Sequence, residues 1–472
     1  MSEAIIVGSG PNGLVCAAWL ARGGVKVTVL EAQARIGGGA RTSELTLPGL
    51  LHDDCSAVHA MAVGAPSLNE LSLERHGLEW CWPEVDLAHP LDGGAGAVMV
   101  RSIAGTAAGL GRDGRTWERV FSSPSRGFAA LSEDIMRPLL HVPRHPLRLA
   151  RFGVAAAMPA TLIARKFRTQ EARALWGGCA AHAFSPLSRP MSSSVGMALI
   201  CAGHSYGWPV ARGGSQAISD ALAAVIREHG GKIETGRRVT SLSELGSADA
   251  VVLDLAPGAV AEVAGERLPA RVARAYRRYK HGPGAFKVDL AVAEGVPWCN
   301  EAARRAGTVH ASGSFEEIAG GERAINRGQM PERPFVLVCQ QSLADPSRAK
   351  DGVHPVWAYA HVPHDYTGDV SEALLDQIER FAPGLRERIL AKAVCSPSEL
   401  ASYNSNYAGG DIINGANTPW QTVIRPRLAL DPYSTGIPGV FICSAATPPG
   451  AGAHGMNGYN AARSVLRSLG SA

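Results

Sequence analysis

Residues 8–13 read GSGPNG, the glycine spacing of loops that bind the diphosphate of a dinucleotide. Residues 4–8 (AIIVG) are predicted to form a buried strand. The apolar residues after the loop recur at helical spacing, so the glycines are expected between a strand and a helix. There, Gly8 permits a tight turn, Gly10 lets the backbone approach a pyrophosphate, and Gly13 lets helix and strand pack closely. The predicted phosphate-binding residues are Gly8, Ser9, Gly10, Pro11, Asn12 and Gly13.

An acidic residue ends the next predicted strand. Residues 25–31 (VKVTVLE) are rich in β-branched side chains, and Glu31 lies 18 positions after Gly13. A carboxylate there can accept hydrogen bonds from both ribose hydroxyls, and it would repel a 2′-phosphate. These elements predict one Rossmann-type strand–helix–strand unit of about 30 residues, with Glu31 and Ala32 at the cofactor.

A second glycine loop follows directly, because residues 35–42 read RIGGGART. Three glycines between two arginines suit a loop that wraps an anionic ligand with its backbone while the guanidinium groups neutralise charge. A plain surface loop is the alternative interpretation. The residues predicted to contact the cofactor here are Arg35, Gly38, Gly39, Ala40 and Arg41.

A third glycine-rich stretch lies near the end of the chain, where residues 448–456 read PPGAGAHGM. It repeats the dinucleotide spacing from Gly450 to Gly455, but only 17 residues follow, too few for a helix, a turn and a strand carrying the acid. The better interpretation is a loop that brings the N-terminus of the last helix to a ligand. Such a terminus stabilises negative charge, which a reduced flavin carries near N1 and its C2 oxygen.

Five stretches in this order resemble the phytoene-desaturase-related FAD oxidoreductases of the amine-oxidase-like superfamily. The resemblance spans nearly the whole chain and implies a two-domain fold with non-covalent FAD. It also implies that the backbone at Val239 contributes to adenine recognition and that the flavin ring lies beside Ala453, His454, Gly455 and Met456. The stretches are GSGPNG, RIGGGART, residues 208–242 (WPVARGGSQAISDALAAVIREHGGKIETGRRVTSL), NYAGGDIING at 406–415 and TPPGAGAHGMNGYNAA at 447–462.

One stretch departs from the family pattern. Many amine-oxidase relatives place Gly-Asp before the final loop, whereas this chain reads CSAA at 443–446. The contact with the ribityl and pyrophosphate part of FAD would then come from Ser444 or from the backbone at Ser444 and Ala445, or be absent. His454, inside the loop expected to face the flavin, is a candidate catalytic residue.

Lys287 is the other catalytic candidate. It lies in residues 281–298 (HGPGAFKVDLAVAEGVPW), which resemble the monoamine-oxidase strand whose lysine holds a water against flavin N5. An ammonium in an apolar strand is unexpected, because burying it without a partner is costly. The alternative is a lysine that points outward from a half-exposed strand.

The pattern along the chain predicts an α/β protein, α+β overall, with a Rossmann-type FAD-binding domain interleaved with a mixed α+β substrate domain. The first domain is expected from residues 1–66, 206–265 and 421–472, and the second from residues 67–205 and 266–420. Strands are expected at KIETG and RVTSL within residues 232–242, and an apolar run at 152–163 predicts a helix.

Composition excludes several classes. A net charge of +4 with no block of five basic residues argues against nucleic-acid binding. Nine cysteines without a CxxC pair predict no metal site and no disulfide framework, and fit a reducing cytoplasm. Residues 152–163 are too short to span a bilayer, so their helix is expected in the core, on the protein surface, or lying on a membrane.

We therefore expect FAD to take a hydride onto flavin N5 from a C–H bond of an organic, largely apolar substrate. The electrons would pass to oxygen, a quinone or a nicotinamide. Two alternatives stay open: a redox-neutral flavin-dependent isomerase, and a lipid-binding chaperone with the fold of the GDP-dissociation inhibitors. The sequence predicts neither the identity of the substrate nor an oligomeric state.

Overall fold

The structure, a computed structural model, describes residues 2–470. Its first sheet is wholly parallel and is built from strands far apart in the chain. The strand at Ala250–Leu253 is buried throughout, as strands of parallel sheets usually are, whereas the edge strand at Lys232–Glu234 is largely exposed. In spatial order the strands are β16 (Val440–Ile442), β10 (Ala250–Leu253), β1 (Glu3–Val7), β2 (Lys26–Leu30) and β9 (Lys232–Glu234).

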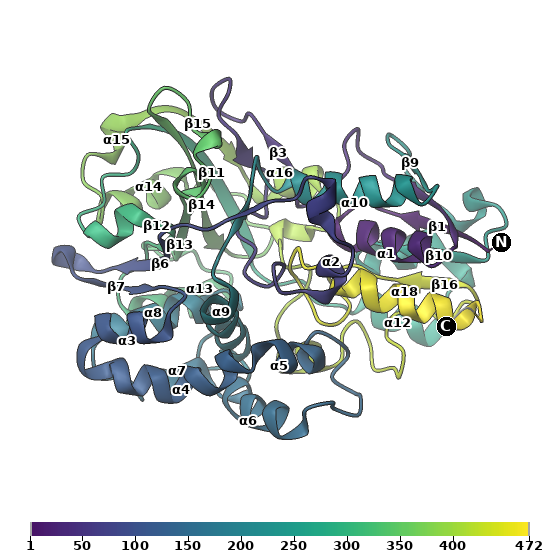
Figure 1. Ribbon diagram of the computed structural model, residues 1–472, viewed down its shortest axis with the longest axis horizontal. Coiled ribbons are helices and arrows are strands. Elements are labelled where there is room, and N and C mark those ends of the chain that lie inside the picture. Colours follow the sequence, from purple (N-terminus) through teal and green to yellow (C-terminus); the bar gives the residue numbers. More distant parts are fainter. Residues whose placement is uncertain (1, 471–472) are drawn as a thin grey trace.

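Three helices pack together beside this sheet. α1 (Pro11–Arg22) contacts both α10 (Gln216–Glu228) and the final helix α18 (Met456–Ser468). Figure 1 shows the yellow α18 lying against the purple N-terminal elements. The approach is close because Gly458 has no side chain: a Cβ there would overlap with the carbonyl oxygen of Asn12.

The second sheet is larger and mostly antiparallel, with one parallel pair between β6 and β12. Its two longest strands pair over ten residues, from Gly284 opposite Val362 to Ala293 opposite Val353. In spatial order the strands are β15 (Ile389–Cys395), β11 (Gly284–Ala293), β14 (Val353–Val362), β13 (Val336–Cys339), β12 (Ala306–His310), β6 (Val85–Pro90) and β7 (Gly96–Met99).

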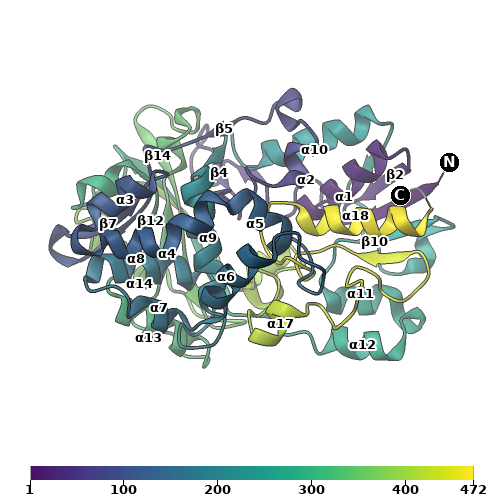
Figure 2. The same cartoon turned by 60° about the horizontal axis from the view of Figure 1, so that its bottom comes forward.

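A helical region packs beside the second sheet, below it in Figure 1 and at the front in Figure 2. Its core contains the buried side chains of Trp117, Phe121 and Trp176. Its helices are α3 (Ile103–Gly109), α4 (Gly114–Arg126), α5 (Phe128–Ile135), α6 (Pro146–Ala157), α7 (Ala160–Ala164), α8 (Gln170–Ala181) and α9 (Ser193–Tyr206).

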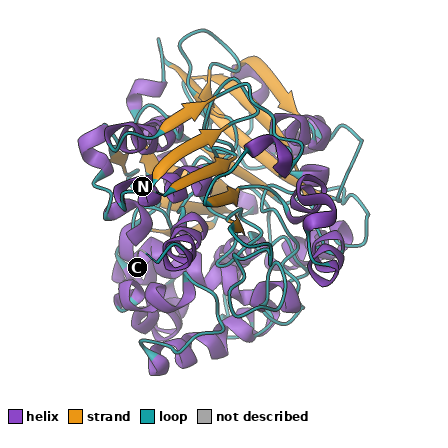
Figure 3. Cartoon of the chain, turned by 90° about the vertical axis from the view of Figure 1, so that its right-hand side faces the viewer, coloured by secondary structure: helices purple, strands orange, loops and turns teal. Residues whose placement is uncertain are grey.

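Shorter elements connect these layers, and Figure 3 shows helices surrounding the strands. Two small antiparallel sheets pair β3 (Thr42–Ser43) with β4 (His52–Asp53), and β5 (Trp80–Cys81) with β8 (Val210–Ala211). The remaining α-helices are α2 (Pro66–Asn69), α11 (Pro257–Ala264), α12 (Ala270–Arg277), α13 (Phe315–Ile325), α14 (Ser371–Glu379), α15 (Leu385–Arg388), α16 (Pro397–Tyr403) and α17 (Pro419–Val423).

The predicted fold class is confirmed, and two local predictions are wrong. Residues 238–242 form no strand, since the chain turns into a short 3-10 helix at Leu242–Leu245. The apolar run at 152–163 is divided between α6 and α7, because Pro159 lacks the N–H that a continuous helix needs. The domain bounds stay a prediction. α12, which the prediction assigns to the second domain, shares a hydrophobic core cluster with β10 and β16 of the first. No helix among residues 2–470 is long and apolar enough to cross a membrane.

Candidate functional site

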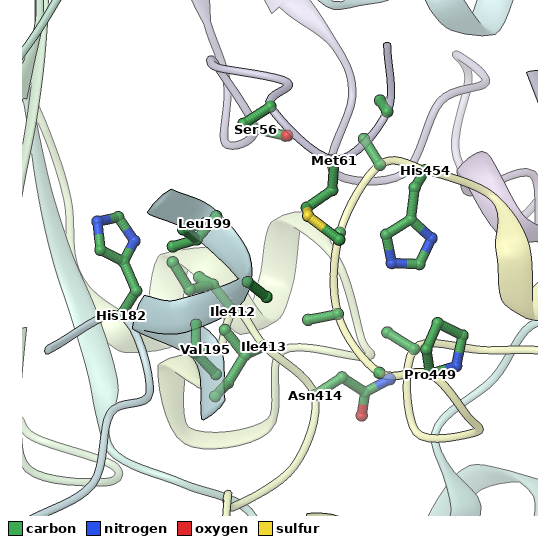
Figure 4. A pocket seen from close by; sticks show the side chains of 18 of the residues that line it. Ser56, Met61, His182, Val195, Leu199, Ile412, Ile413, Asn414, Pro449 and His454 are labelled. Carbon is green, nitrogen blue, oxygen red and sulfur yellow. The ribbon is translucent and has the colours of Figure 1, made fainter. Parts of the chain in front are cut away.

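A cavity of about 570 Å³ joins the first glycine loop to the second sheet. Gly10, Pro11 and Asn12 form one end, and Trp357 and Tyr359 of β14 form part of the other. Figure 4 shows His454 on one side of the cavity and His182, Val195 and Leu199 on the other. Further lining comes from residues 55–62, from α6, α9 and β13, and from residues 404–425 and 449–454.

The first glycine loop has the geometry that its spacing predicts. Gly8 has φ +99°, in the left-handed region that favours glycine. A Cβ at Gly13 would overlap with the carbonyl oxygen of Gly8, so this glycine allows α1 to pack against β1. The loop therefore presents the N-terminus of α1 to the cavity, where free N–H groups and the helix dipole favour an anion.

Asp254, which follows β10, occupies this position with its own carboxylate. Its Oδ2 accepts a 3.0 Å hydrogen bond from the backbone N–H of Gly13, and a Cβ at Gly10 would lie 2.6 Å from the same oxygen. Burial raises the pKa of Asp254 to about 6; the nearby Glu31 contributes to this rise, and hydrogen bonds from the backbone of Gly13 and Gly10 oppose it. The sequence interpretation missed this residue, although a polar side chain at the carboxyl end of a central parallel strand marks a ligand site.

Glu31 is buried just after β2 and is held by the chain around it. Its Oε2 accepts hydrogen bonds from the backbone N–H of Ser9 at 2.9 Å and from the Ser9 hydroxyl at 2.5 Å. Its Oε1 accepts from the N–H of Gln33 at 2.8 Å and lies 3.8 Å from Nη2 of Arg41. The carboxylate is thus fixed beside the glycine loop, as binding of a ribose requires.

The second glycine loop packs onto the first. A Cβ at Gly38 would lie 2.8 Å from Cα of Gly10. The two arginines donate mainly to the loop itself: Arg41 to the carbonyls of Ile36 and Arg35, and Arg35 to the carbonyl of Thr42. Their hydrogen bonds shape the loop, and neither side chain lines the cavity.

His454 lines the cavity and is buried in the C-terminal loop. Its Nδ1 accepts a 3.1 Å hydrogen bond from the backbone N–H of Met456, at the start of α18. Burial lowers the pKa of His454 to about 4. The ring is therefore neutral near pH 7, and because Nδ1 is an acceptor, its single proton lies on Nε2.

Several polar groups at the predicted cofactor contacts have no partner. Among residues 2–470, Asn12 Oδ1 and Ser444 Oγ are buried without a hydrogen bond, and the backbone of Val239 makes none. Ala445, next to Ser444, lines the cavity. Buried polar atoms are nearly always satisfied in native proteins. The hydroxyl and phosphate groups of a dinucleotide would supply partners, so the residues present fit such a group.

Lys287 is buried in β11, so the alternative that it points to solvent is wrong. Its Nζ forms an ion pair with Asp289, two positions along the same strand and therefore on the same face. It also lies 5.9 Å from the ring centroid of Trp357. Trp357 lines the cavity and Lys287 does not, so the predicted role of Lys287 at flavin N5 stays a prediction.

The structure brings part of the predicted site to the cavity wall. The predicted residues that line the cavity are Gly10, Pro11, Asn12, Gly39, Ala445, Ala453 and His454. The remaining predicted residues do not line it, namely Gly8, Ser9, Gly13, Glu31, Ala32, Arg35, Gly38, Ala40, Arg41, Val239, Lys287, Ser444, Gly455 and Met456. Besides Asp254, the sequence interpretation missed Arg425, Asn406 and Asn414, which also line it.

Comparisons with known proteins agree with this arrangement. Residues 6–71 match the family model described as an NAD(P)-binding Rossmann-like domain. The chain is 24% identical to pyridine nucleotide-disulfide oxidoreductase domain-containing protein 2 of Rattus norvegicus, over 99% of this chain and 94% of the relative. It is 25% identical to phytoene dehydrogenase of Streptomyces griseus, over 96% and 92% of the two chains.

Solved structures share the whole fold. A putrescine oxidase bound to putrescine matches with a TM-score of 0.62 at 15% identity, covering 99% of each chain. An oxidoreductase from Methanosarcina mazei matches with a TM-score of 0.61 at 16% identity, covering 98% of this chain and 100% of the other. The resemblance to phytoene-desaturase-related proteins and the fold shared with an amine-oxidising enzyme are confirmed, and so is the expectation of a Rossmann-type dinucleotide-binding domain.

Proposed function

We propose that the chain is an FAD-dependent oxidoreductase acting on a largely apolar organic substrate. The observation that carries this proposal is the single cavity that runs from the glycine loop at Gly10, past His454, to an apolar chamber at Trp357. A cofactor bound along the glycine loop would thus extend into the chamber where a substrate could bind. The names of the relatives, a phytoene dehydrogenase among them, support oxidation at carbon.

FAD fits better than NAD(P) for two reasons. Glu31 is fixed at the ribose position, where its charge would repel the 2′-phosphate of NADP. The second reason is the closing loop, because residues 449–454 line the cavity and lead directly into α18. The N-terminus of that helix would stabilise the negative charge of a reduced flavin, which a nicotinamide does not carry.

The residues of the chain would then bind, orient and shield. The N–H groups of the glycine loop face the diphosphate, Glu31 accepts from a ribose, and Ser444 and Asn12 gain their missing partners. The neutral His454, held by the N–H of Met456 and by the backbone of Ala451, would line the flavin end of the cavity. When bound, FAD accepts a hydride from a C–H bond, which none of these side chains could do.

The chamber beyond is suited to an apolar substrate. Its walls include Phe184, Leu337, Trp357 and Tyr359, all buried. Such walls exclude water from the reacting carbon and bind a hydrocarbon by burial of apolar surface. His182 also lines the chamber, with its Nε2 3.0 Å from Nε2 of His310, and burial lowers the pKa of His182 to about 3. It is therefore neutral near pH 7, and its burial disfavours protonation.

The test is anaerobic bleaching of the flavin absorbance by a library of apolar alcohols, amines, acids and polyenes. Reoxidation is then followed with oxygen, a quinone and a nicotinamide. Bleaching by at least one class supports the proposal and identifies its substrates. Flavin that isomerises a polyene without bleaching would support a redox-neutral isomerase, and a chain that takes up no flavin would refute the proposal.

A further inference from the structure

Arg425 is a buried cation in the wall of the cavity, two residues after α17. Only 4% of its surface is exposed. Nε donates to the carbonyl of Gln421 at 3.0 Å, and Nη2 donates to Oδ1 of Asn417 at 2.8 Å, so the guanidinium plane is held in place. Nη1 makes no hydrogen bond to any of residues 2–470, and a Cβ at Gly450 would lie 2.9 Å from it.

No acidic side chain neutralises this guanidinium. Within residues 2–470 no carboxylate oxygen lies within 4.0 Å of Arg425, in contrast to the buried Arg348, which pairs with Asp53 and Asp345. Arg425 is also the single arginine or lysine among the residues that line the cavity. A buried charge is costly unless it is paired, so a guanidinium left without an acid favours an anion from outside the chain.

The side chain of Asn414, close to the C-terminal loop that contains Gly450, also lacks hydrogen-bond partners in the part of the chain that the structure describes. Asn414 lines the cavity, and Figure 4 shows its amide beside Pro449, the residue before Gly450. Its Oδ1 is buried without a hydrogen-bond partner among the described residues, and its Nδ2 donates to no described atom. A polar ligand group at this end of the cavity would therefore meet a fixed cation and an amide.

We propose that Arg425 binds an oxyanion of the substrate, such as a carboxylate, through its free Nη1 edge. Guanidinium is the side chain best suited to this, because its donors match a planar carboxylate. The chamber around Phe184, Leu337 and Trp357 is apolar, so the substrate class is an amphiphile: a hydrocarbon body with one anionic end. This inference rests on the proposed function, because it assigns the substrate of the same cavity.

The probes are dodecanoate, dodecanol and dodecylamine, titrated calorimetrically into the protein as purified. We expect dodecanoate to bind about tenfold or more tightly than dodecanol, and dodecylamine to bind no better than the alcohol. Arg425→Gln should lower dodecanoate affinity at least about tenfold while leaving dodecanol affinity and flavin content unchanged. Arg425→Lys should recover part of the loss.

Arg427→Gln is the matched control, because Arg427 lies two positions away, is half-buried and does not line the cavity. Equal affinities for the acid and the alcohol in the wild type would overturn the proposal. So would an Arg425→Gln chain that loses flavin but keeps dodecanoate binding, which would assign the guanidinium to a cofactor phosphate. A flavin-free wild type that still prefers dodecanoate would refute the proposed oxidation and leave the anion site standing.

A separate surface, made by α6 and its neighbours, carries an independent inference. Residues 135–170 contain seven arginines and lysines and no aspartate or glutamate. Among the described residues, Arg144 has an acidic partner in Glu133 and the other six have none within 4.0 Å. The basic residues are Arg137, Arg144, Arg148, Arg151, Arg165, Lys166 and Arg168.

The same segment exposes large apolar side chains. Val142 is 90% exposed and Leu147 is 86% exposed, and Leu140, Val154 and Leu162 are also exposed. The opposite face of α6 lines the cavity, and Ala157 at its end is both exposed and part of the lining. α17, whose Trp420 is 70% exposed, carries the lining residue Thr422, and Figure 2 shows α6 and α17 on the side turned forward.

We infer that this face docks on an anionic lipid bilayer, with α6 lying in the membrane surface. Apolar side chains interspersed with unpaired cations on one helix face are the pattern of interfacial helices. Each lysine or arginine near an anionic leaflet adds to the attraction, and leucine and valine enter the headgroup boundary. The face also borders the cavity at Ala157, so a ligand dissolved in the bilayer would have a short route inward.

The test is flotation of the full chain with phosphatidylcholine vesicles, with and without about a third of phosphatidylglycerol. We expect binding to the anionic vesicles that weakens with salt, and about tenfold less in Arg148→Glu/Arg151→Glu and in Leu147→Glu/Val154→Glu. The controls are Arg323→Glu/Arg327→Glu and Leu390→Glu, exposed positions on other elements. A wild-type chain that does not bind anionic vesicles overturns the inference. So does a wild-type dimer in solution that the Leu147→Glu/Val154→Glu variant dissociates, because the face would then be a protein interface.

Discussion

The carboxylate of Asp254 accepts a hydrogen bond of 3.0 Å from the backbone N–H of Gly13. That N–H lies in the first turn of α1, where the dipole and the glycine loop favour a cofactor diphosphate. An acid of the chain therefore lies where the phosphates are expected. The two can coexist easily only when the carboxyl group is protonated, in which state it can donate to a phosphate oxygen.

Cofactor binding should for this reason depend on pH. Burial raises the pKa of Asp254 to about 6, and a bound diphosphate would raise it further. Binding then takes up a proton above pH 6, so FAD affinity should fall by up to about tenfold per pH unit. Calorimetry of the flavin-free chain across this range measures the slope. Asp254→Asn, which keeps an acceptor for Gly13, should bind FAD more tightly near pH 8 and lose the slope; an unchanged slope would contradict this account.

The same shift should affect the unliganded fold. The pKa of Asp254 is raised from 3.8, so the fold favours the protonated acid. Its stabilising contribution is present at pH values below 3.8 and is lost as the pH rises through 6. Asp254→Asn is therefore expected to raise the melting temperature of the flavin-free chain at neutral pH, where the wild type carries the ionised carboxylate. A lower melting temperature there would show that the charge is compensated.

Glu31→Ala should weaken FAD binding. A hydrogen bond to a charged group contributes about 1.5–3 kcal/mol, which corresponds to a loss of one to two orders of magnitude in affinity. The variant also leaves the N–H groups of Ser9 and Gln33 without their acceptor. Glu234→Ala, an exposed acid on the adjacent strand β9, serves as the control. Equal FAD affinity in both variants would mean that the ribose lies elsewhere.

Gly10→Val should give a folded chain without flavin, or insoluble chain if folding needs the cofactor. The first added carbon would lie 2.6 Å from the Asp254 carboxylate, and the branched side chain would fill the approach to the phosphates. Gly320→Val is a useful control, because nothing lies within 4 Å of a Cβ at that helical position. Flavin content per chain distinguishes the two, and full occupancy in Gly10→Val would show that the phosphates bind at another place.

The Lys287 and Asp289 pair should act chiefly as a structural ion pair. Removing one partner of a buried pair costs about 3–5 kcal/mol, whereas replacing both with apolar residues is often neutral. Lys287→Met should therefore destabilise the chain strongly, and Lys287→Met/Asp289→Leu should recover most of the loss in denaturant unfolding. Stopped-flow rates of flavin reduction and reoxidation in the double variant then test the remaining prediction. Slower reoxidation alone would place the lysine charge near flavin N5.

Local patterns predicted the first strand–helix–strand unit well. The helix at Pro11–Arg22 and the strands at β1 and β2 follow from apolar runs bounded by glycines, and the loop between them has the expected geometry. Residues 238–242, with Val239 and Thr240 among them, were predicted as a strand, yet among residues 2–470 β9 is the edge of the sheet and no further strand pairs with it. Tertiary context overrides strand propensity in such a case.

The parts of the site that the sequence did not predict depend on contacts between distant residues. Asp254 reaches Gly13 across 241 positions, and Nη1 of Arg425 lies beside Gly450 of the C-terminal loop. Lys287 is an unexpected cation in an apolar strand when the sequence is considered alone. In the fold, Asp289 on the same face is its ion-pair partner. Single residues with unsatisfied charge are visible in a sequence, but their partners become visible only in the fold.

We expect the chain to hold one FAD without a covalent bond, and acid precipitation of freshly purified protein measures this. The supernatant is analysed by chromatography against FAD, FMN and NAD(P) standards, and the amount is compared with the chain concentration. The protein should be yellow and release FAD in a ratio approaching one per chain, with no flavin left in the pellet. A colourless chain that takes up no FAD on incubation, or one that releases only NAD(P), would contradict it.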